Sequence, residues 1–168
     1  MKLIKELRKD SDMAKCGKFK VRRAARTILV NDKGEVALMN VTKGNYYKIP
    51  GGGIEYSEDI IEAVHREARE EAGCEIKIVD ELGMIIEYRP LQELLQISYC
   101  YVSKVTKAGA PSFTDEEIAD GYGLEWHSLD DALALMRKTQ SKKDPYYNGA
   151  ARDYEFMMEY CKSVRGMV

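Results

Sequence analysis

The sequence has few of the residues that build metal centres from nitrogen and sulfur ligands. It contains only two histidines, and its four cysteines (Cys16, Cys74, Cys100 and Cys161) lie far apart without a CxxC pair. Zinc sites and disulfide frameworks need clustered ligands or paired cysteines. The sequence therefore argues against both kinds of site, and we expect the cysteines to be single buried thiols.

The sequence also lacks long hydrophobic runs and a strong net charge. Its longest apolar runs fall far short of the ~20 residues of a membrane helix, and the apolar core of a signal peptide is missing after the first basic residues. A net charge of −2 gives no electrostatic case for binding a nucleic-acid backbone. We therefore expect a soluble, cytoplasmic protein whose partners include no membrane and no nucleic acid.

The composition is that of an ordinary globular protein, with 45% hydrophobic and 32% charged residues. A chain of 168 residues is long enough for one domain with a sizeable core. Residues 1–20 are basic and only weakly periodic, so we expect an N-terminal arm or helix there. A single domain is predicted over residues 21–168.

Hydrophobic periodicity and turn signals divide this domain into strands and helices. Strands are predicted at 26–30, 35–41, 74–79, 82–88, 94–105 and 124–126, and helices at 58–72, 129–138 and 152–164. Residues 106–121 are expected to form a polar loop. Strands that flank a mid-chain helix and are followed by two more helices favour an α/β/α sandwich.

The predicted helix at 58–72 carries carboxylates beside its apolar face. Rotation of about 100° per residue places Glu67, Glu70 and Glu71 on one arc. The adjoining arc is apolar and is expected to be buried; it holds Ile60, Ile61, Val64, Ala68 and Ala72. Two like charges about 4 Å apart repel by roughly 4 kcal/mol at an effective dielectric constant of 20. A hard cation such as Mg²⁺ or Mn²⁺ would neutralise the three glutamates, although a solvated acidic surface is the alternative for the triplet alone.

A glycine-rich turn precedes this helix. Pro50 is followed by Gly51, Gly52 and Gly53, a backbone that can come close to a ligand, and Ser57 is expected to cap the helix. Residues 52–74, GGIEYSEDIIEAVHREAREEAGC, resemble the Nudix box. All its fixed glycine, glutamate and arginine positions are matched, by Gly52, Glu58, Arg66, Glu67, Glu70, Glu71 and Gly73. The mild departures are Ser57, Ala68 and Cys74.

This resemblance implies the Nudix fold, a mixed β-sheet between helices, and a pyrophosphohydrolase of the MutT-like class. Such enzymes cleave the phosphoanhydride of a nucleoside diphosphate linked to another group. By resemblance, Glu67, Glu70 and Glu71, with the carbonyl of Gly51, would hold Mg²⁺ or Mn²⁺. Arg66 would orient one of these glutamates.

The catalytic base and the substrate contacts are also expected by resemblance. Glu117 in the late polar loop, or a box glutamate such as Glu70, would act as the base, with Glu116 and Asp120 as alternates for the loop acid. The substrate would be contacted by Gly52, Gly53, Glu58 and Tyr47, and the ring of Tyr47 could stack on a nucleobase.

Substrate identity is left open by the sequence. A nucleoside triphosphate, including an oxidised one, is the first hypothesis. ADP-ribose or a nucleotide sugar is the second, because Pro90 resembles a marker of ADP-sugar hydrolysis. A catalytically silent nucleotide sensor, an enzyme acting on RNA and a module with a merely solvated acidic helix are the further alternatives. Family members often form homodimers, so a homodimer is an additional hypothesis.

Overall fold

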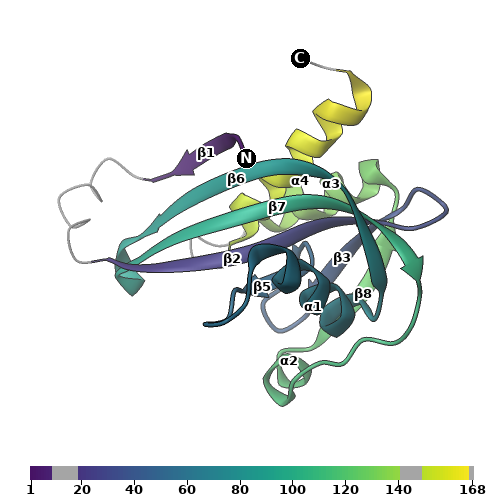
Figure 1. Cartoon of the computed structure of the whole chain (residues 1–168), viewed down its shortest axis with the longest axis horizontal. Helices are drawn as coiled ribbons and strands as arrows, with labels where there is room; N and C mark the ends of the chain where they lie inside the picture. Colours follow the sequence, from purple (N-terminus) through teal and green to yellow (C-terminus); the bar gives the residue numbers. More distant parts are fainter. Residues whose placement is uncertain (9–18, 141–148, 167–168) are drawn as a thin grey trace.

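The computed structural model describes residues 1–8, 19–140 and 149–166. A long twisted sheet runs through the centre of the molecule (Figure 1). Its strands are β1 (Leu3–Leu7), β2 (Lys20–Val30), β3 (Val36–Val41), β4 (Tyr46–Lys48), β5 (Gly51–Gly53), β6 (Glu75–Arg89), β7 (Leu94–Lys107) and β8 (Tyr122–His127). The helices are α1 (Ile60–Ala72), the short 3₁₀ helix η2 (Pro90–Gln92), α2 (Asp115–Ala119), α3 (Leu129–Gln140) and α4 (Ala150–Arg165).

The sheet is mixed, as the resemblance implied. Its main order is β1-β6-β7-β2-β3-β4, while β5 pairs with β2 and β8 pairs with β3. Strands β2 and β7 run parallel along their whole shared length, from the pair Lys20 and Leu94 to the pair Val30 and Lys104. The pairs β6–β7, β2–β5 and β3–β8 are antiparallel. The predicted hairpin between β2 and β3 pairs at Val30 and Val36.

Helices cover both faces of this sheet (Figure 1). On one face, Val64 and Ala68 of α1 share a buried cluster with Leu29 of β2. On the other face, α3 and α4 pack over a second cluster that includes Ile28 and Phe156. Even and odd residues of β2 thus enter different cores, because successive side chains of a strand point to opposite faces. The predicted α/β/α sandwich is confirmed.

Two expectations about the chain outside the box were wrong. Residues Leu3–Leu7 form neither an arm nor a helix but strand β1, which pairs in parallel with β6. Lysines of this segment also bond to α4, through the pairs Lys2–Glu159 and Lys5–Glu155. The predicted loop at 106–121 contains a helical turn, α2. Residues 9–18 of the predicted arm and residues 141–148 lie outside the described part of the chain.

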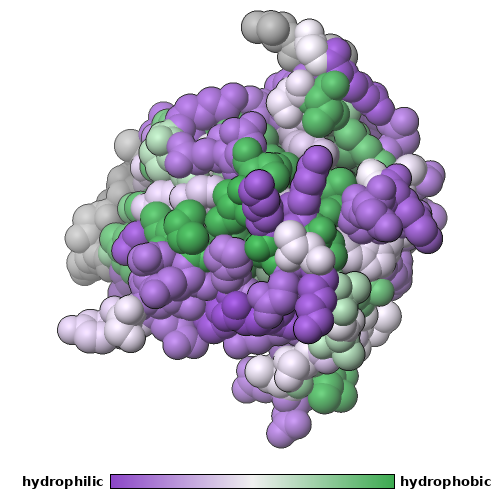
Figure 2. Space-filling model, turned by 45° about the vertical axis from the view of Figure 1, so that its right-hand side comes forward, coloured by the Kyte–Doolittle hydropathy of each residue, from purple (hydrophilic) through white to green (hydrophobic). Residues whose placement is uncertain are grey.

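The expectation of single buried thiols is confirmed for three of the four cysteines. The thiols of Cys74, Cys100 and Cys161 are free and buried, whereas Cys16 lies outside the described residues. Within those residues, no helix is both long and apolar enough to cross a membrane. The face shown in Figure 2 is mostly hydrophilic, with hydrophobic residues gathered in a central band.

The turn between β4 and α1 depends on a glycine that pairs within the sheet. Gly51 lies opposite Arg26 of β2 and has a φ of 137°, a conformation that residues with a side chain rarely adopt. A Cβ at this position would lie 2.2 Å from the carbonyl oxygen of Ala25. The close approach of β5 to β2 therefore requires glycine here.

Gly51→Ala is expected to destabilise the fold by about 2 kcal/mol or more, since it adds backbone strain and a clash with β2. Gly123→Ala is the matched control, because a Cβ at Gly123 of β8 meets no atom within 4 Å. Urea unfolding should leave this control within about 0.5 kcal/mol of the wild type. Equal stability of the two variants would contradict the requirement for glycine at position 51.

Candidate active site

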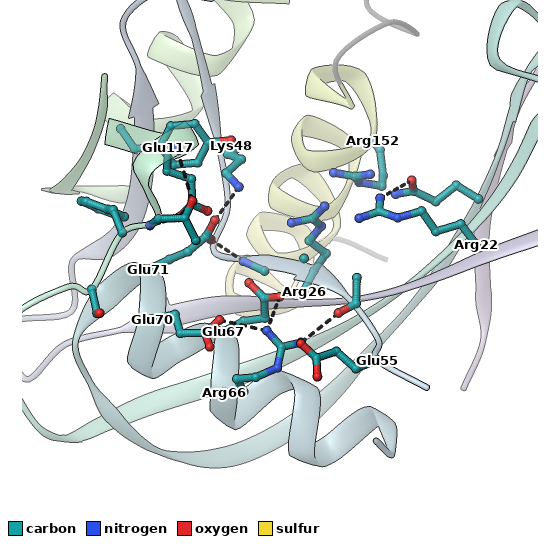
Figure 3. A pocket seen from close by; sticks show the side chains of 18 of the residues that line it. Arg22, Arg26, Lys48, Glu55, Arg66, Glu67, Glu70, Glu71, Glu117 and Arg152 are labelled. Atoms are coloured by element: carbon teal, nitrogen blue, oxygen red, sulfur yellow. Dashed lines mark hydrogen bonds and ion pairs between the residues drawn. The ribbon is translucent and has the colours of Figure 1, made fainter. Parts of the chain in front are cut away.

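A cavity of about 740 Å³ opens between the glycine turn, α1 and the loop that carries α2. Its carboxylates gather around Lys48 and Arg66, while Arg22 and Arg152 lie away from them at the other end (Figure 3). The acidic part is formed by Glu55, Glu67, Glu70, Glu71 and Glu117. The basic residues of the lining are Arg22, Arg26, Lys48, Arg66, Arg89 and Arg152. Gly51, Gly52 and Gly53 line the cavity between them.

Helix α1 begins two residues later than predicted. Asp59, and not Ser57, caps it: the Asp59 carboxylate accepts the backbone N–H of Glu62, and the Glu62 carboxylate accepts that of Asp59. This reciprocal pair is the stronger arrangement, because it satisfies two orphan donors at once. The predicted apolar face needs one correction: Ile61 is exposed, and Ala63 is buried in its place.

Arg66 connects the carboxylates of the acidic part through hydrogen bonds. Its Nε and Nη2 donate to the two carboxylate oxygens of Glu58 at 2.8 and 2.9 Å. Its Nη1 donates to Glu67 at 2.8 Å and to Glu70 at 2.9 Å, and Nη2 also donates to the Gly53 carbonyl at 2.8 Å. The expected ion pair of Arg66 with a box glutamate is present. The hydrogen bonds that Arg66 donates to Glu58 are the main cause that raises the pKa of Arg66.

Glu58 lies behind Arg66 and outside the lining of the cavity. The structure thus gives Glu58 the position of a residue that holds the arginine in place, and its predicted contact with the substrate stays a prediction. The hydrogen bonds from Arg66 hold the pKa of Glu58 below its ordinary value.

Glu71 and Glu67 are the buried members of the acidic part. Glu71 accepts from Lys48 Nζ at 2.6 Å and from the Gly51 N–H at 2.7 Å. Burial, and then the negative charge of Glu71, raise the pKa of Glu67. A Cβ at Gly52 would lie 2.3 Å from Glu67 Oε1. Only glycine at this position lets the turn approach the carboxylate so closely.

The donor chemistry fits a hard divalent cation. Glu67, Glu70 and Glu71 are all oxygen donors on one cavity wall, and Glu70 is half-exposed, with 48% of its side chain accessible. Within the described residues, no three His, Cys, Asp or Glu side chains are already gathered at ligand positions. The reason is that Arg66 and Lys48 hold these carboxylates. Arg66 takes one oxygen of Glu67 and one of Glu70, which leaves the second oxygen of each carboxylate for a metal.

The three late-loop acids are placed differently. Glu117 lines the cavity, whereas Glu116 and Asp120 are outside its lining. The Glu117 carboxylate accepts from the Thr114 N–H at 2.8 Å, and Thr114 caps the same helix, α2. Asp120 pairs instead with Lys43. The structure therefore brings together Glu117 and the box glutamates.

Tyr47 lies outside the lining of the cavity, so its predicted contact with the substrate stays a prediction. Tyr47 packs toward α3 and α4, where its hydroxyl lies 3.3 Å from Glu125. The neighbouring Tyr46 lines the cavity, as do Phe113 and Tyr122. Since adjacent strand residues point to opposite faces, an error of one position places the ring on the wrong side. Burial is the main cause that raises the pKa of Tyr46 to about 12.

The sequence interpretation missed the arginines at the other end of the cavity. Arg22 and Arg26 come from β2, Arg89 from the end of β6, and Arg152 from the first turns of α4 (Figure 3). A signal was available in β2, because Arg22 and Arg26 share one face of the strand. A second was Arg152 followed by Asp153, two charged residues in a helix that has to pack on the sheet.

Comparisons with known proteins agree with this arrangement. The sequence pattern of the NUDIX domain matches residues 20–148. The chain belongs to the Nudix family. Diphosphoinositol polyphosphate phosphohydrolase 2 of Rattus norvegicus is 28% identical over 120 residues, which are 71% of this chain and 64% of that protein. The expectation of a Nudix hydrolase is thereby confirmed at the level of the family.

Solved structures support the Nudix fold. A NUDIX hydrolase from Nitrosomonas europaea superposes with a TM-score of 0.65 at 17% identity, over 86% of this chain and 90% of that one. The MutT protein of Methanosarcina mazei Go1 gives 0.60 at 18% identity, over 88% and 98% of the two chains. The Ap4A hydrolase of C. elegans gives 0.59 at 15% identity, over 86% and 99%.

Glu58→Gln is expected to lower the free energy of unfolding by about 2 kcal/mol at pH 7, because charged hydrogen bonds to Arg66 are lost. The lowered folded-state pKa of Glu58 stabilises the protein above its ordinary value of 4.5. That contribution is lost as the pH falls through the folded-state pKa, so the wild type and the variant should then converge.

Urea unfolding at neutral and acidic pH measures both effects. Glu116→Gln is the control, since it makes the same charge change at an exposed position. A constant difference between wild type and Glu58→Gln at every pH would contradict the role of the Glu58 charge.

Proposed function

We propose that this Nudix protein is a divalent-metal-dependent hydrolase of a phosphoanhydride bond in a substrate with several phosphate groups. A nucleoside triphosphate, including an oxidised one, is the first candidate. The observation that carries the proposal is one cavity in which carboxylates of α1 face guanidinium groups of β2, β6 and α4. Carboxylates suit Mg²⁺ or Mn²⁺, and guanidinium groups suit phosphate oxygens.

Glu67, Glu70 and Glu71, with the carbonyl of Gly51, would hold Mg²⁺ or Mn²⁺, which screens the charge of the anhydride and lowers the pKa of a bound water. Arg66 orients Glu67 and Glu70 through its Nη1, and Lys48 orients Glu71.

Glu117 or Glu70 takes the proton of the attacking water as the new bond from oxygen to phosphorus forms. The bond from phosphorus to the bridging oxygen then breaks. For Glu117 this role requires its carboxylate to leave Thr114.

Support for a nucleotide comes from the aromatic residues beside α2. Tyr46, Phe113 and Tyr122 line the cavity, and Phe113 and Tyr122 already meet edge to face, with ring centroids 6.1 Å apart. Aromatic rings offer an apolar surface to a nucleobase. ADP-ribose or a nucleotide sugar fits this wall as well, but it uses less of the basic end of the cavity.

A diphosphoinositol polyphosphate is a second candidate, because the basic end of the cavity favours a substrate with many phosphates. The rat relative carries that substrate in its name. A catalytically silent nucleotide sensor is the non-enzymatic alternative. In each case the partner is a small molecule and no nucleic acid; the cytoplasmic location and the homodimer stay predictions.

The decisive experiment is a Mg²⁺-dependent screen for phosphate and pyrophosphate release from nucleoside triphosphates, oxidised dGTP, ADP-ribose, dinucleoside polyphosphates and diphosphoinositol polyphosphates.

Glu70→Gln should lower turnover of the best substrate by about 100-fold or more. Its folding should be unchanged, because the side chain of Glu70 is half-exposed and, within the described part of the chain, is seen bonded to Arg66 alone. Turnover near the wild-type rate would reject the metal-site assignment, and binding without turnover by the wild type would favour the sensor.

Glu117→Gln tests the loop acid separately. We expect kcat to fall by about 100-fold, with Glu116→Gln and Asp120→Asn close to the wild type. Steady-state kinetics with the substrate found in the screen measures the three variants side by side. Full activity of Glu117→Gln would leave a box glutamate as the base.

A further inference from the structure

We propose that Arg22, Arg26, Arg89 and Arg152 form a subsite for a phosphate group of the substrate that takes no part in the cleaved anhydride. This inference rests on the proposed function, because it extends the same cavity beyond the acidic residues of α1. It assigns the substrate at least three phosphate groups: two joined by the scissile bond and one held by the arginines.

The first support is convergence from distant parts of the chain. Arg22 and Arg26 are on β2, Arg89 ends β6, and Arg152 is on α4, yet all four line the cavity (Figure 3). Their charges act on one another: burial lowers the pKa of Arg22, and the nearby charges of Arg26, Arg89 and Arg152 lower it further. Four cations this close together are unfavourable unless anions compensate them.

The second support is the shortage of such anions inside the protein. Glu87 accepts from Arg152 and from Arg89, each at 2.9 Å, and Asp153 accepts from Arg152 at 2.7 Å. Among the described residues, the side-chain partner of Arg22 is the neutral Gln96, at 2.9 Å. Arg152 therefore bonds to two carboxylates, and Arg89 bonds to one of the same two. Arg22 and Arg26 have no direct carboxylate partner among the described residues.

The third support is unused hydrogen-bonding capacity at buried atoms. Nε and Nη1 of Arg26 and Nε of Arg89 are buried without a hydrogen-bond partner in the described ranges 1–8, 19–140 and 149–166. Arg26 is only 6% exposed, and burial lowers its pKa. A buried donor left unsatisfied costs free energy, more so when it is charged. A phosphate group offers several acceptor oxygens and a negative charge, which match these donors in both geometry and sign.

A purely structural role explains only part of the cluster. The bonds of Arg152 to Glu87 and Asp153 tie α4 to β6, and such buried pairs are ordinary in a fold. Arg26 makes no comparable bond to another described residue, although it lies between Arg152 and the glutamates of α1 (Figure 3). Its unsatisfied donors indicate a ligand.

The test is calorimetric titration of inorganic tripolyphosphate into the metal-free protein, which requires no turnover. We expect Arg26→Gln and Arg22→Gln each to raise the Kd by about tenfold or more, since charged hydrogen bonds are lost. Arg23→Gln is the matched control: it removes the same charge from the same strand, but Arg23 lies over the Tyr99 ring and outside the cavity lining. Its Kd should equal that of the wild type.

Failure of the subsite and failure of the proposed function have different signatures. Wild-type Kd values in both Arg26→Gln and Arg22→Gln, equal weakening in Arg23→Gln, or no binding of tripolyphosphate by the wild type would each overturn the subsite. Absence of hydrolysis with retained, Arg26-dependent binding would reject only the enzymatic proposal. Arg22 is more exposed than Arg26. The Arg22→Gln variant therefore keeps the test valid if Arg26→Gln does not fold.

Titrations with a nucleoside triphosphate and with inositol hexakisphosphate distinguish the molecule that carries the phosphate. The one that matches the physiological substrate should bind more tightly and lose affinity in Arg26→Gln. If neither loses affinity in that variant, the subsite is overturned.

Discussion

The bonds of Arg66 to its carboxylates are the interaction on which the site depends. One guanidinium joins Glu58, just before α1, to Glu67 and Glu70 within the helix, and also to the carbonyl of Gly53. Without this cation, Glu67, Glu70 and Glu71 would repel one another on a single wall. The same bonds keep the glycine turn against the helix. Arg66 therefore both fixes the position of the turn and balances the charge of the acids.

The glycine turn and the sheet complete this arrangement. Gly51 fits against β2, Gly52 leaves room for Glu67, and the N–H of Gly51 bonds to Glu71. Small residues in the turn thus let the backbone itself serve as a wall of the cavity. At the other end of the cavity, Arg152 is buried with Glu87 and Asp153 as its partners, so charged groups are enclosed between α4 and β6.

Much of the fold could be predicted from the sequence, and the site only in part. The acids of α1 were found because they lie within one helix, where spacing fixes the arc. The positions of Glu58 and Tyr47 outside the cavity lining could not be predicted, because they depend on the path of a turn and on which face of a short strand a ring occupies. The arginine cluster was missed because it unites β2, β6 and α4, and the pairing of distant strands cannot be read from local periodicity. Strand β1 was missed since its short, basic sequence has no strand pattern of its own.

The parallel pairing of β2 with β7 has a consequence for how the protein folds. Bonds such as that from Arg22 to Gln96 join residues 74 positions apart, and the glycine turn, α1 and β6 all lie in the chain between the two strands. Closing so long a loop costs entropy before the contacts reward it, and contacts of this range are associated with slow folding. The acidic helix can form early, but the cavity that it shares with the arginines exists only once the central strands have met.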